Sequence, residues 1–464
     1  MYSPVYLPSR QPLLWLVAIA FFMQALDSTI VNTALPSMAK SLDASPLRMQ
    51  SVVVAYVLSV AVLIPASGWL ADRVGLRRIF ALAMLVFAAG SLACAMANSL
   101  EMLVVARVIQ GLGGALLMPV GRLAVLRYSP TGQFLAAMSF VTVPGLIGPL
   151  IGPTLGGWLV HVASWHWIFL INLPIALIGW IATLRIMPND HQTDLPRFDL
   201  WGYAYLVLAM VGISLALDRL AMTGGQLSNA VLGWLVAGIV GLLAYLWHAR
   251  RSRSGLLFSP SLFAVAGFRA GILGNLLVRM GGSTAPFILP LYLQLVGKLS
   301  ALDAGLMMIP LTIGSILVKK ILPPLVARFG YAAVLRGNTV LMGLGMMSGV
   351  LMSALPQWSI AILFVLIGSI NSVQFVSMNA LTLKDLPPQA ASSGNSLMSM
   401  TMMLAMSLGV ALASVMVNVF GQIGKNQSLE QAFDLTFSCI GLWVMASSWI
   451  FWRYREPEDV AKAT

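Results

Sequence analysis

Fourteen long apolar runs occupy most of this 464-residue sequence. About 20 apolar residues in a helix cross the roughly 30 Å of hydrocarbon in a lipid bilayer. The runs therefore predict an all-α integral membrane protein with fourteen membrane-spanning helices. They lie at residues 12–34, 50–71, 79–98, 102–124, 134–158, 166–186, 200–218, 226–248, 268–295, 303–322, 331–354, 358–382, 396–421 and 432–453.

Composition supports the same conclusion. The chain is 59% hydrophobic and only 9% charged, whereas soluble domains carry about a quarter of charged residues. Too few polar side chains are present to cover a globular surface in water. A lipid bilayer is the expected solvent and the first expected partner of the chain.

The net charge of +12 is explained by where the basic residues fall. Lys and Arg concentrate in the tails and loops on one side of the predicted spans, and Arg107 and Arg279 fall within spans. The positive-inside rule therefore places both termini in the cytoplasm. A nucleic-acid partner is not needed to account for the charge. The opposite side carries only Lys40, Arg48, Arg219, Lys298 and Lys425.

A weak internal repeat divides the chain. Arg73-x-Gly75, after the second span, is matched by Arg328-x-Gly330 after the tenth. Duplicated helix bundles around a midplane site are typical of alternating-access transporters, and such a design argues against a channel. The expected domains are a six-helix bundle at 1–190, two additional helices at 191–255 and a second six-helix bundle at 256–464.

Several kinds of chemistry have no signature in the sequence. No GxxxxGK[ST] loop is present to hold ATP phosphates, and no cluster of metal ligands or catalytic triad is suggested. We expect neither an enzyme nor a metal site nor any cofactor. Transport by such a chain would be driven by an ion gradient.

The first span carries a polar stripe made of Gln24, Asp27, Ser28 and Asn32, which share one helix face. A charge in hydrocarbon costs about 2.5–3.5 kcal/mol or more, so Asp27 needs a reason to be there. Loss of water favours the neutral form of a carboxyl group, so Asp27 is a candidate proton carrier. Alternatively, it reaches interfacial water or pins a neighbouring helix.

In the fourth span, Arg107, Gln110, Gly111 and Gly114 share a face. The glycines let another helix approach Arg107 closely. A positive charge whose distance from Asp27 changes with conformation would change proton affinity between the two states. A static buried ion pair is the alternative.

The fifth span, VPGLIGPLIGPTLGGWL, alternates prolines with glycines. This composition predicts a smooth, kinked helix that can slide against another helix. Packing without mobility is the alternative.

The second half offers two further polar faces, which we interpret as walls of a substrate cavity. Arg279 is the more informative residue because an embedded cation needs a purpose; pairing with backbone carbonyls or a distant acid is the alternative. The full candidate cavity comprises Gln24, Ser28, Asn32, Gln110, Asn275, Arg279, Ser283, Asn371 and Gln374.

Five motifs together resemble one family: LDSTIVNTALP, GWLADRVGLRR, RVIQGLGGALLMPV, GPLIGPTLGG and WHWIFLINLPI. The chain resembles the major facilitator superfamily, in its fourteen-helix drug:proton antiporter branch, over nearly its whole length. The resemblance implies a proton site at Asp27 with a coupling role for Arg107. It also implies a cytoplasmic gate at Gly68, Asp72, Arg73, Gly75, Arg77 and Arg78, and an antiporter hinge at Gly148, Gly152, Pro153, Gly156 and Gly157.

Asp72 lies at the cytoplasmic end of its span, where it could cap a helix of the opposite half and latch the outward-open state. The second copy has Ala327 in place of the acid, so any latch is asymmetric.

The expected function is proton-coupled export of small amphiphilic molecules across the bacterial inner membrane, by a monomer. Asp27 is the only acid placed deep in the predicted spans, whereas Arg107 and Arg279 are both basic. Export of organic anions such as carboxylates is therefore the alternative.

Overall fold

The computed structural model describes residues 11–44, 49–130, 133–189, 197–223, 225–251, 256–299, 301–423 and 428–454. Every regular element in these ranges is helical. The chain divides into two compact units, Met1–Leu195 and Pro196–Thr464. Helices suit a chain of this composition because they satisfy their backbone hydrogen bonds internally, where lipid offers none.

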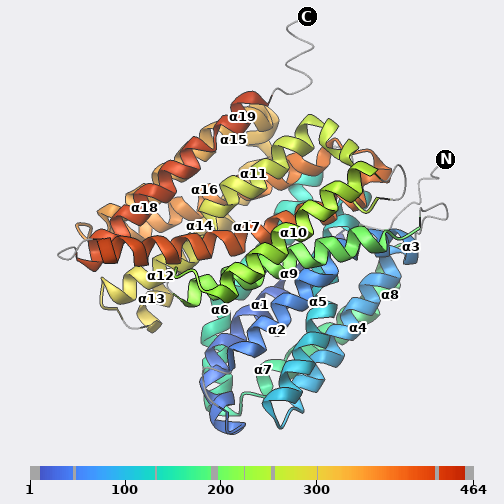
Figure 1. Ribbon diagram of the computed structural model, residues 1–464, viewed down its shortest axis with the longest axis horizontal. Helices are drawn as coiled ribbons and strands as arrows, with labels where there is room; N and C mark the ends of the chain where they lie inside the picture. The colour runs from blue at the N-terminus through green and yellow to red at the C-terminus, as the bar shows by residue number, and fades with distance from the viewer. Residues whose placement is uncertain are drawn as a thin grey trace, which may run out of the picture. The chain divides into compact units, whose positions relative to one another are not determined.

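In its described residues, the first unit contains eight α-helices and one 3-10 turn, and Figure 1 labels these α-helices. A buried core cluster lies between α1, α2, α4, α5, α6 and α7. Helix α6 packs along α1, α5 packs against both α2 and α4, and α8 packs against α4 and α1. The elements are α1 (Gln11–Ser41), α2 (Gln50–Leu63), η2 (Ile64–Ala66), α3 (Ser67–Val74), α4 (Leu76–Ala95), α5 (Leu100–Tyr128), α6 (Phe134–Val162), α7 (Trp167–Leu170) and α8 (Asn172–Ile186).

The second unit contains the remaining helices. Its core brings α11, α15, α16, α17 and α18 together, with Tyr292 in edge-on contact with Phe433 and Phe437. The elements are α9 (Leu200–Met222), α10 (Asn229–Arg251), η3 (Pro260–Ala264), α11 (Ala266–Gly282), α12 (Ala285–Leu295), α13 (Ala301–Met307), α14 (Ile309–Leu317), η4 (Val318–Lys320), α15 (Leu322–Met347), η5 (Ser348–Leu351), α16 (Gln357–Lys384), α17 (Pro388–Ile423), α18 (Leu429–Ala446) and α19 (Trp449–Arg453).

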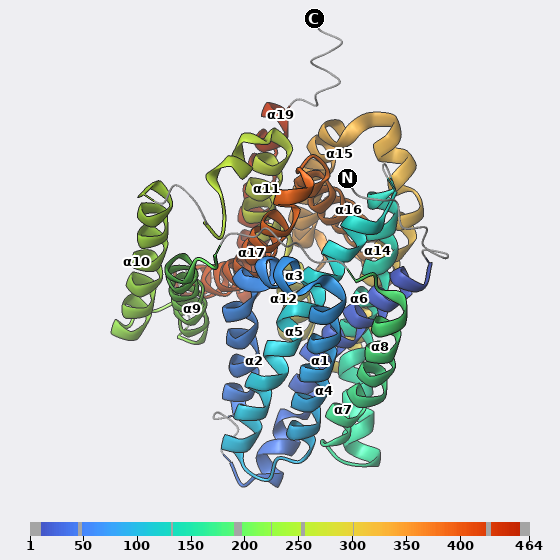
Figure 2. The ribbon, with the colours of Figure 1, turned by 90° about the vertical axis from the view of Figure 1, so that its right-hand side faces the viewer.

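Helices α9 and α10, the pair predicted as an insertion, lie side by side (Figure 2). Glycines explain how closely they approach: a Cβ on Gly212 would lie 2.6 Å from the backbone nitrogen of Gly238, and one on Gly241 would lie 2.7 Å from that of Ala209. Small residues at a helix interface allow this close packing in lipid. Within the second unit the pair also contacts α17, through α9.

Twelve segments of the described residues are long and apolar enough to cross a membrane. Two of the fourteen predicted spans are not among them. The span predicted at 134–158 falls on α6, part of which has side chains outside the described residues. The span predicted at 303–322 is broken into α13, α14 and η4, and Pro310, which has no N–H to donate, stands at the start of α14.

The weak sequence repeat is visible in the backbone. Gly75, between α3 and α4, has φ 98° and ψ 143°, and Gly330, inside α15, has φ 75° and ψ 164°. A positive φ is a conformation that glycine adopts far more readily than other residues. In both matched segments, the glycine of the Arg-x-Gly pattern therefore has a positive φ and an extended ψ.

Candidate functional site

An ion pair between Asp27 and Arg107 lies inside the first unit. Arg107 Nη1 is 2.8 Å from Asp27 Oδ2. Asp27 is fully buried and Arg107 is 1% exposed. Helix α1 supplies the acid and α5 the base, so the packing of these two helices places the pair. Charges removed from water in this way need every polar atom satisfied.

Two side-chain amides complete the partners of the carboxylate. Gln110 Nε2 donates to Asp27 Oδ1 at 2.8 Å, and Asn172 Nδ2 donates to the same oxygen at 3.0 Å. Gln110 Oε1 accepts from Arg107 Nη1 at 2.6 Å, and Ser91 Oγ accepts from Gln110 Nε2 at 2.7 Å. These five residues form the Asp27 cluster, in which the carboxylate accepts three hydrogen bonds, a set suited to its ionised form.

Helix α2 covers the guanidinium of Arg107. The ring of Tyr56 lies 4.2 Å from the guanidinium carbon, and Arg107 Nε donates to the carbonyl oxygen of Val52 at 3.3 Å. A Cβ on Gly111 would lie 2.8 Å from the Tyr56 carbonyl oxygen, and one on Gly114 would lie 2.6 Å from its hydroxyl. The close approach of another helix, predicted from these glycines, is therefore present.

Two other members of the predicted polar stripe on α1, Gln24 and Ser28, lie outside this cluster. Gln24 is half-buried, and Ser28 is exposed and donates its hydroxyl to the carbonyl of Ala25 at 2.8 Å. The side chain of Asn32 lies outside the described residues. Within the predicted stripe, Asp27 is therefore buried in the interior of the unit, whereas Ser28 is exposed.

A second buried cation, Arg279, lies in the second unit, on α11. Its Nε donates to Asn275 Oδ1 at 3.0 Å, and its Nη2 donates to Asn379 Oδ1 at 3.1 Å. The ring of Phe375 lies 4.2 Å from the guanidinium carbon, and Asn275 Nδ2 donates to Thr382 Oγ1 at 3.3 Å. These residues form the Arg279 cluster, in which the arginine meets neutral amides.

Gln374, also predicted for the cavity, belongs to a neighbouring hydrogen-bonded chain. It is fully buried, donates to Thr339 Oγ1 at 2.8 Å and accepts from Asn338 Nδ2 at 2.9 Å. Asn371 and Ser283 are half-buried. Of these predicted cavity residues, Asn275 and Arg279 bond each other, whereas Gln374 bonds Asn338 and Thr339.

The predicted cytoplasmic gate is built around the α3–α4 turn. Gly68 and Asp72 are buried, whereas Arg73 and Arg78 are exposed and Arg77 is half-buried. The carboxylate of Asp72 pairs with Arg127 of α5, within the same unit. The latch to the opposite half remains a prediction.

Helix α6 meets α1 through a stripe of glycines spaced four residues apart. A Cβ on Gly148 would lie 2.7 Å from the backbone nitrogen of Leu26, and one on Gly156 would lie 2.9 Å from the carbonyl oxygen of Ile30. Gly152 faces Thr29 equally closely, whereas a Cβ on Gly157 would make only an ordinary contact. The side chain of Pro153 lies outside the described residues. The predicted hinge is therefore in backbone contact with the helix that carries Asp27.

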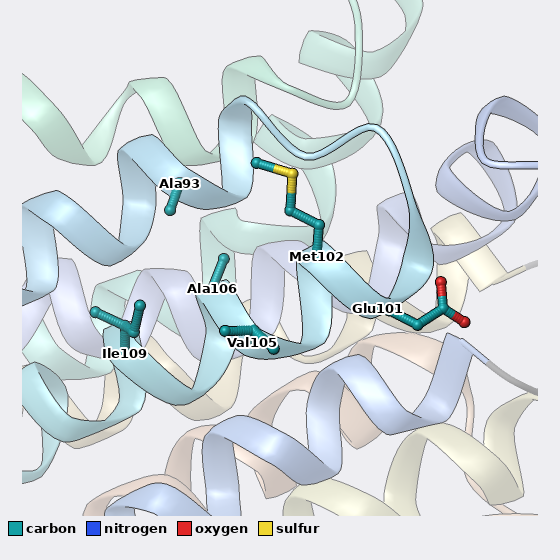
Figure 3. A pocket seen from close by; sticks show the side chains of 6 residues that line it. All are labelled: Ala93, Glu101, Met102, Val105, Ala106 and Ile109. Atoms are coloured by element: carbon teal, nitrogen blue, oxygen red, sulfur yellow. The ribbon is translucent and has the colours of Figure 1, made fainter.

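A pocket on the surface of the first unit contains none of the predicted cavity residues (Figure 3). It lies along α4 and α5, and five of its six lining side chains are apolar, with the Glu101 carboxylate at one end. The described residues contain no group of three or more His, Cys, Asp or Glu side chains placed to hold a metal ion.

Sequence reasoning missed Asn172 and Ser91 in the first unit, and Asn379, Thr382 and Phe375 in the second. One signal was available for Asn172: it is a polar residue inside the apolar run 166–186, directly before Leu173 and Pro174. Asn379 lies five residues after Gln374 on the same predicted helix, off the face that Asn371 and Gln374 share.

Helices of spanning length, with ionised and amide side chains buried among them, define a multi-pass membrane protein of the transporter class. The family model of the Major Facilitator Superfamily matches residues 17–410. The chain belongs to this superfamily of membrane transporters.

Its relatives include two bacterial proteins that carry the name "Putative multidrug resistance protein MdtD". The protein of Klebsiella pneumoniae (strain 342) is 50% identical over 460 residues, covering 97% of this chain and 96% of the relative. The protein of Salmonella paratyphi A is 49% identical over 457 residues, covering 96% and 95%.

Two solved structures share the fold. The human organic anion transporter MFSD10 (TETRAN) superposes with a TM-score of 0.66 at 14% identity, covering 96% of this chain and 100% of that one. The proton:xylose symporter XylE superposes with a TM-score of 0.65 at 15% identity, covering 96% and 95%. At such identities the likeness concerns the fold alone.

Proposed function

We propose that this transporter is a proton-coupled antiporter that exports small amphiphilic molecules across the bacterial inner membrane by alternating access. In this proposal both termini are cytoplasmic, the chain acts as a monomer with no cofactor, and fourteen helices span the bilayer. Six form each of two bundles, at 1–190 and 256–464, and the two at 191–255 are additional.

One observation carries the proposal: Asp27 is fully buried and ion-paired with Arg107. When a proton neutralises Asp27, the attraction that holds the pair disappears, and Arg107 keeps Gln110 Oε1, the Val52 carbonyl and the Tyr56 ring as partners. Breaking a buried pair by losing one charge is worth about 3–5 kcal/mol. That energy is large enough to shift an equilibrium between two conformations.

In the proposed cycle, a proton from outside neutralises Asp27, weakens the holding of substrate and returns the carrier to its inward-facing state. Substrate binding and proton release then reverse the change. The α3–α4 turn acts as the cytoplasmic gate. The glycine stripe of α6 acts as the hinge, because it lets α1 move along α6 without bulky side chains in the way.

The names of the relatives support drug-like substrates, and the Arg279 cluster supports the second candidate, organic anions. Arg279 is a permanent cation, 6% exposed, whose guanidinium contacts two neutral amides and an aromatic ring. Neither α11 nor α16, the helices that supply these contacts, contains an acidic residue. A guanidinium forms charge-assisted hydrogen bonds with carboxylates, so this cation would favour an anionic substrate.

Transport by purified protein in liposomes tests the proposal. A pH gradient, acid on the side that corresponds to the periplasm, should drive accumulation of a lipophilic probe by the wild type and not by Asp27→Asn. The Asn variant should still exchange probe across the membrane without a gradient. Uphill accumulation by Asp27→Asn would contradict proton coupling at this residue.

Matched probes separate the two substrate classes. Anionic, neutral and cationic molecules of the same apolar skeleton are compared for export by the wild type and by Arg279→Ala. Loss of anion export alone supports the organic-anion candidate. Unchanged anion export by Arg279→Ala would contradict it.

A further inference from the structure

Asn172 presents one hydrogen-bonded atom and one orphaned atom to the interior of the first unit. It is the first residue of α8 and is 1% exposed. Its Nδ2 donates to Asp27 Oδ1 at 3.0 Å and to Ser91 Oγ at 3.4 Å. Its Oδ1 is buried and accepts no hydrogen bond from the described residues. A buried acceptor without a donor costs about 1–3 kcal/mol and needs an explanation.

The remaining members of the Asp27 cluster explain why such an acceptor would be kept. Among the described residues, the carboxylate meets only donors: Arg107 Nη1, Gln110 Nε2 and Asn172 Nδ2. A protonated carboxyl group carries an O–H donor and therefore needs an acceptor. Gln110 Oε1 already accepts from Arg107 at 2.6 Å, and Ser91 Oγ accepts from Gln110 at 2.7 Å. Asn172 Oδ1 has its accepting capacity unused.

We propose that Asn172 is a positioning residue that reads the protonation state of Asp27, an inference that rests on the proposed proton binding at that residue. Its amide donates Nδ2–H to the carboxylate. When Asp27 binds a proton at Oδ1, the amide rotates about its broad, two-fold terminal torsion, and Oδ1 of Asn172 accepts the new O–H. The rotation exchanges the hydrogen bonds from Nδ2 to Asp27 Oδ1 and to Ser91 Oγ for this one, and the O–H bond of Asp27 is the only covalent bond formed.

Asn172 lies at a junction between two helices, so rotation of its amide can affect the backbone there. It begins α8 immediately after the break that separates α7 from α8 at Ile171. Pro174 has no N–H with which to donate to the carbonyl of Leu170, so the helix is weak at this junction. Movement of the Asn172 amide therefore acts where this part of the chain bends most easily.

Infrared difference spectra of the purified protein between high and low pH test the inference. The band of protonated Asp27 is the carboxylic C=O stretch that disappears in Asp27→Asn. Asn172→Val and Asn172→Thr have the same shape, and only threonine keeps a group that can donate and accept. We expect the Asp27 band at higher wavenumber in the valine variant, where the O–H has lost its acceptor, and close to the wild-type position in the threonine variant.

Each outcome bears on the inference. A band that is the same in Asn172→Val as in the wild type overturns it and leaves proton binding at Asp27 intact. Absence of any Asp27 band in the wild type overturns the proton site itself. Thr183→Val controls for loss of a buried hydroxyl elsewhere on α8, where the side chain bonds only the Gly179 carbonyl at 2.6 Å. If the valine variant does not fold, Asn172→Ala and Asn172→Ser replace the pair.

Discussion

The Asp27 cluster and the Arg279 cluster treat a buried arginine in opposite ways. In both, an aromatic ring lies 4.2 Å from the guanidinium carbon and side-chain amides donate or accept nearby. Arg107 bonds a carboxylate, whereas Arg279 bonds the amide oxygens of Asn275 and Asn379. The Asp27 cluster contains a carboxylate that can lose its charge by binding a proton. In the Arg279 cluster, the amide partners of the arginine carry no charge.

This difference separates two tasks that a coupled transporter needs. A charge that changes with protonation suits energy coupling, and a permanent charge suits recognition of a charged substrate. In the repeat predicted from the sequence, α11 corresponds to α1. The acid on α1 and the arginine on α11 thus reverse the sign of the charge between corresponding helices.

Removing each arginine should give the largest contrast. Arg107→Leu leaves the Asp27 charge buried and unpaired, so we expect a loss of about 3–5 kcal/mol in the free energy of unfolding. The loss should shrink at low pH, because a proton on Asp27 removes the need for a counter-charge. Arg279→Leu should cost about 1–3 kcal/mol with little pH dependence, because the amides it bonds are neutral. Thermal unfolding in detergent at several pH values measures the stability of both variants. Equal pH dependence of the two variants would contradict the difference between the clusters.

Giving the second cluster an acid should make it resemble the first. Asn379→Asp puts a carboxylate where an amide oxygen now lies 3.1 Å from Arg279 Nη2. The new ion pair competes with an anionic substrate, so we expect anion binding to fall about tenfold, or about 1.4 kcal/mol. Isothermal titration with an anionic probe measures the change. Asn379→Leu, which removes the amide without adding charge, is the control; an equal loss in both variants would mean that shape, not charge, matters.

Glycine contacts that position the two clusters should respond alike, and less strongly. In Gly148→Ala the new methyl group would overlap the α1 backbone. In Gly409→Ala it would overlap Met280 and Ser283 at the C-terminal end of α11. We expect each to cost about 1–3 kcal/mol. Gly145→Ala and Gly421→Ala are matched controls, because a Cβ at Gly145 would make an ordinary 3.5 Å contact and one at Gly421 would meet nothing within 4 Å. Denaturation midpoints that do not separate the two pairs would show that the helices are not held by these contacts.

The sequence was most informative where the cost of burying a charge requires a partner of opposite charge. An acid within an apolar run needs a counter-charge, so Asp27 and Arg107 could be considered together before any geometry was known. The glycines around Arg107 could likewise be interpreted, because close packing leaves few other uses for them. The match between Gly75 and Gly330 was also readable, since a sharp turn of positive φ selects glycine.

The rest depended on tertiary placement. Asn172 lies 145 positions from Asp27 along the chain, and an asparagine before Leu-Pro is equally typical of a helix start. Arg122 lies near the end of the predicted span 102–124, and its burial within α5 could not be derived from that position. The break at Pro310 shows that an apolar run of spanning length can contain two short helices, because hydropathy does not register the loss of a backbone donor.

Proton movement driven by substrate is the most direct test of proton coupling at Asp27. Liposomes containing the purified protein and a pH-sensitive dye are given a gradient of an exported probe and no pH gradient. We expect probe efflux to drive protons in the opposite direction with the wild type, and Asp27→Asn to move probe without moving protons. Equal proton movement by Asp27→Asn would show that another group carries the proton.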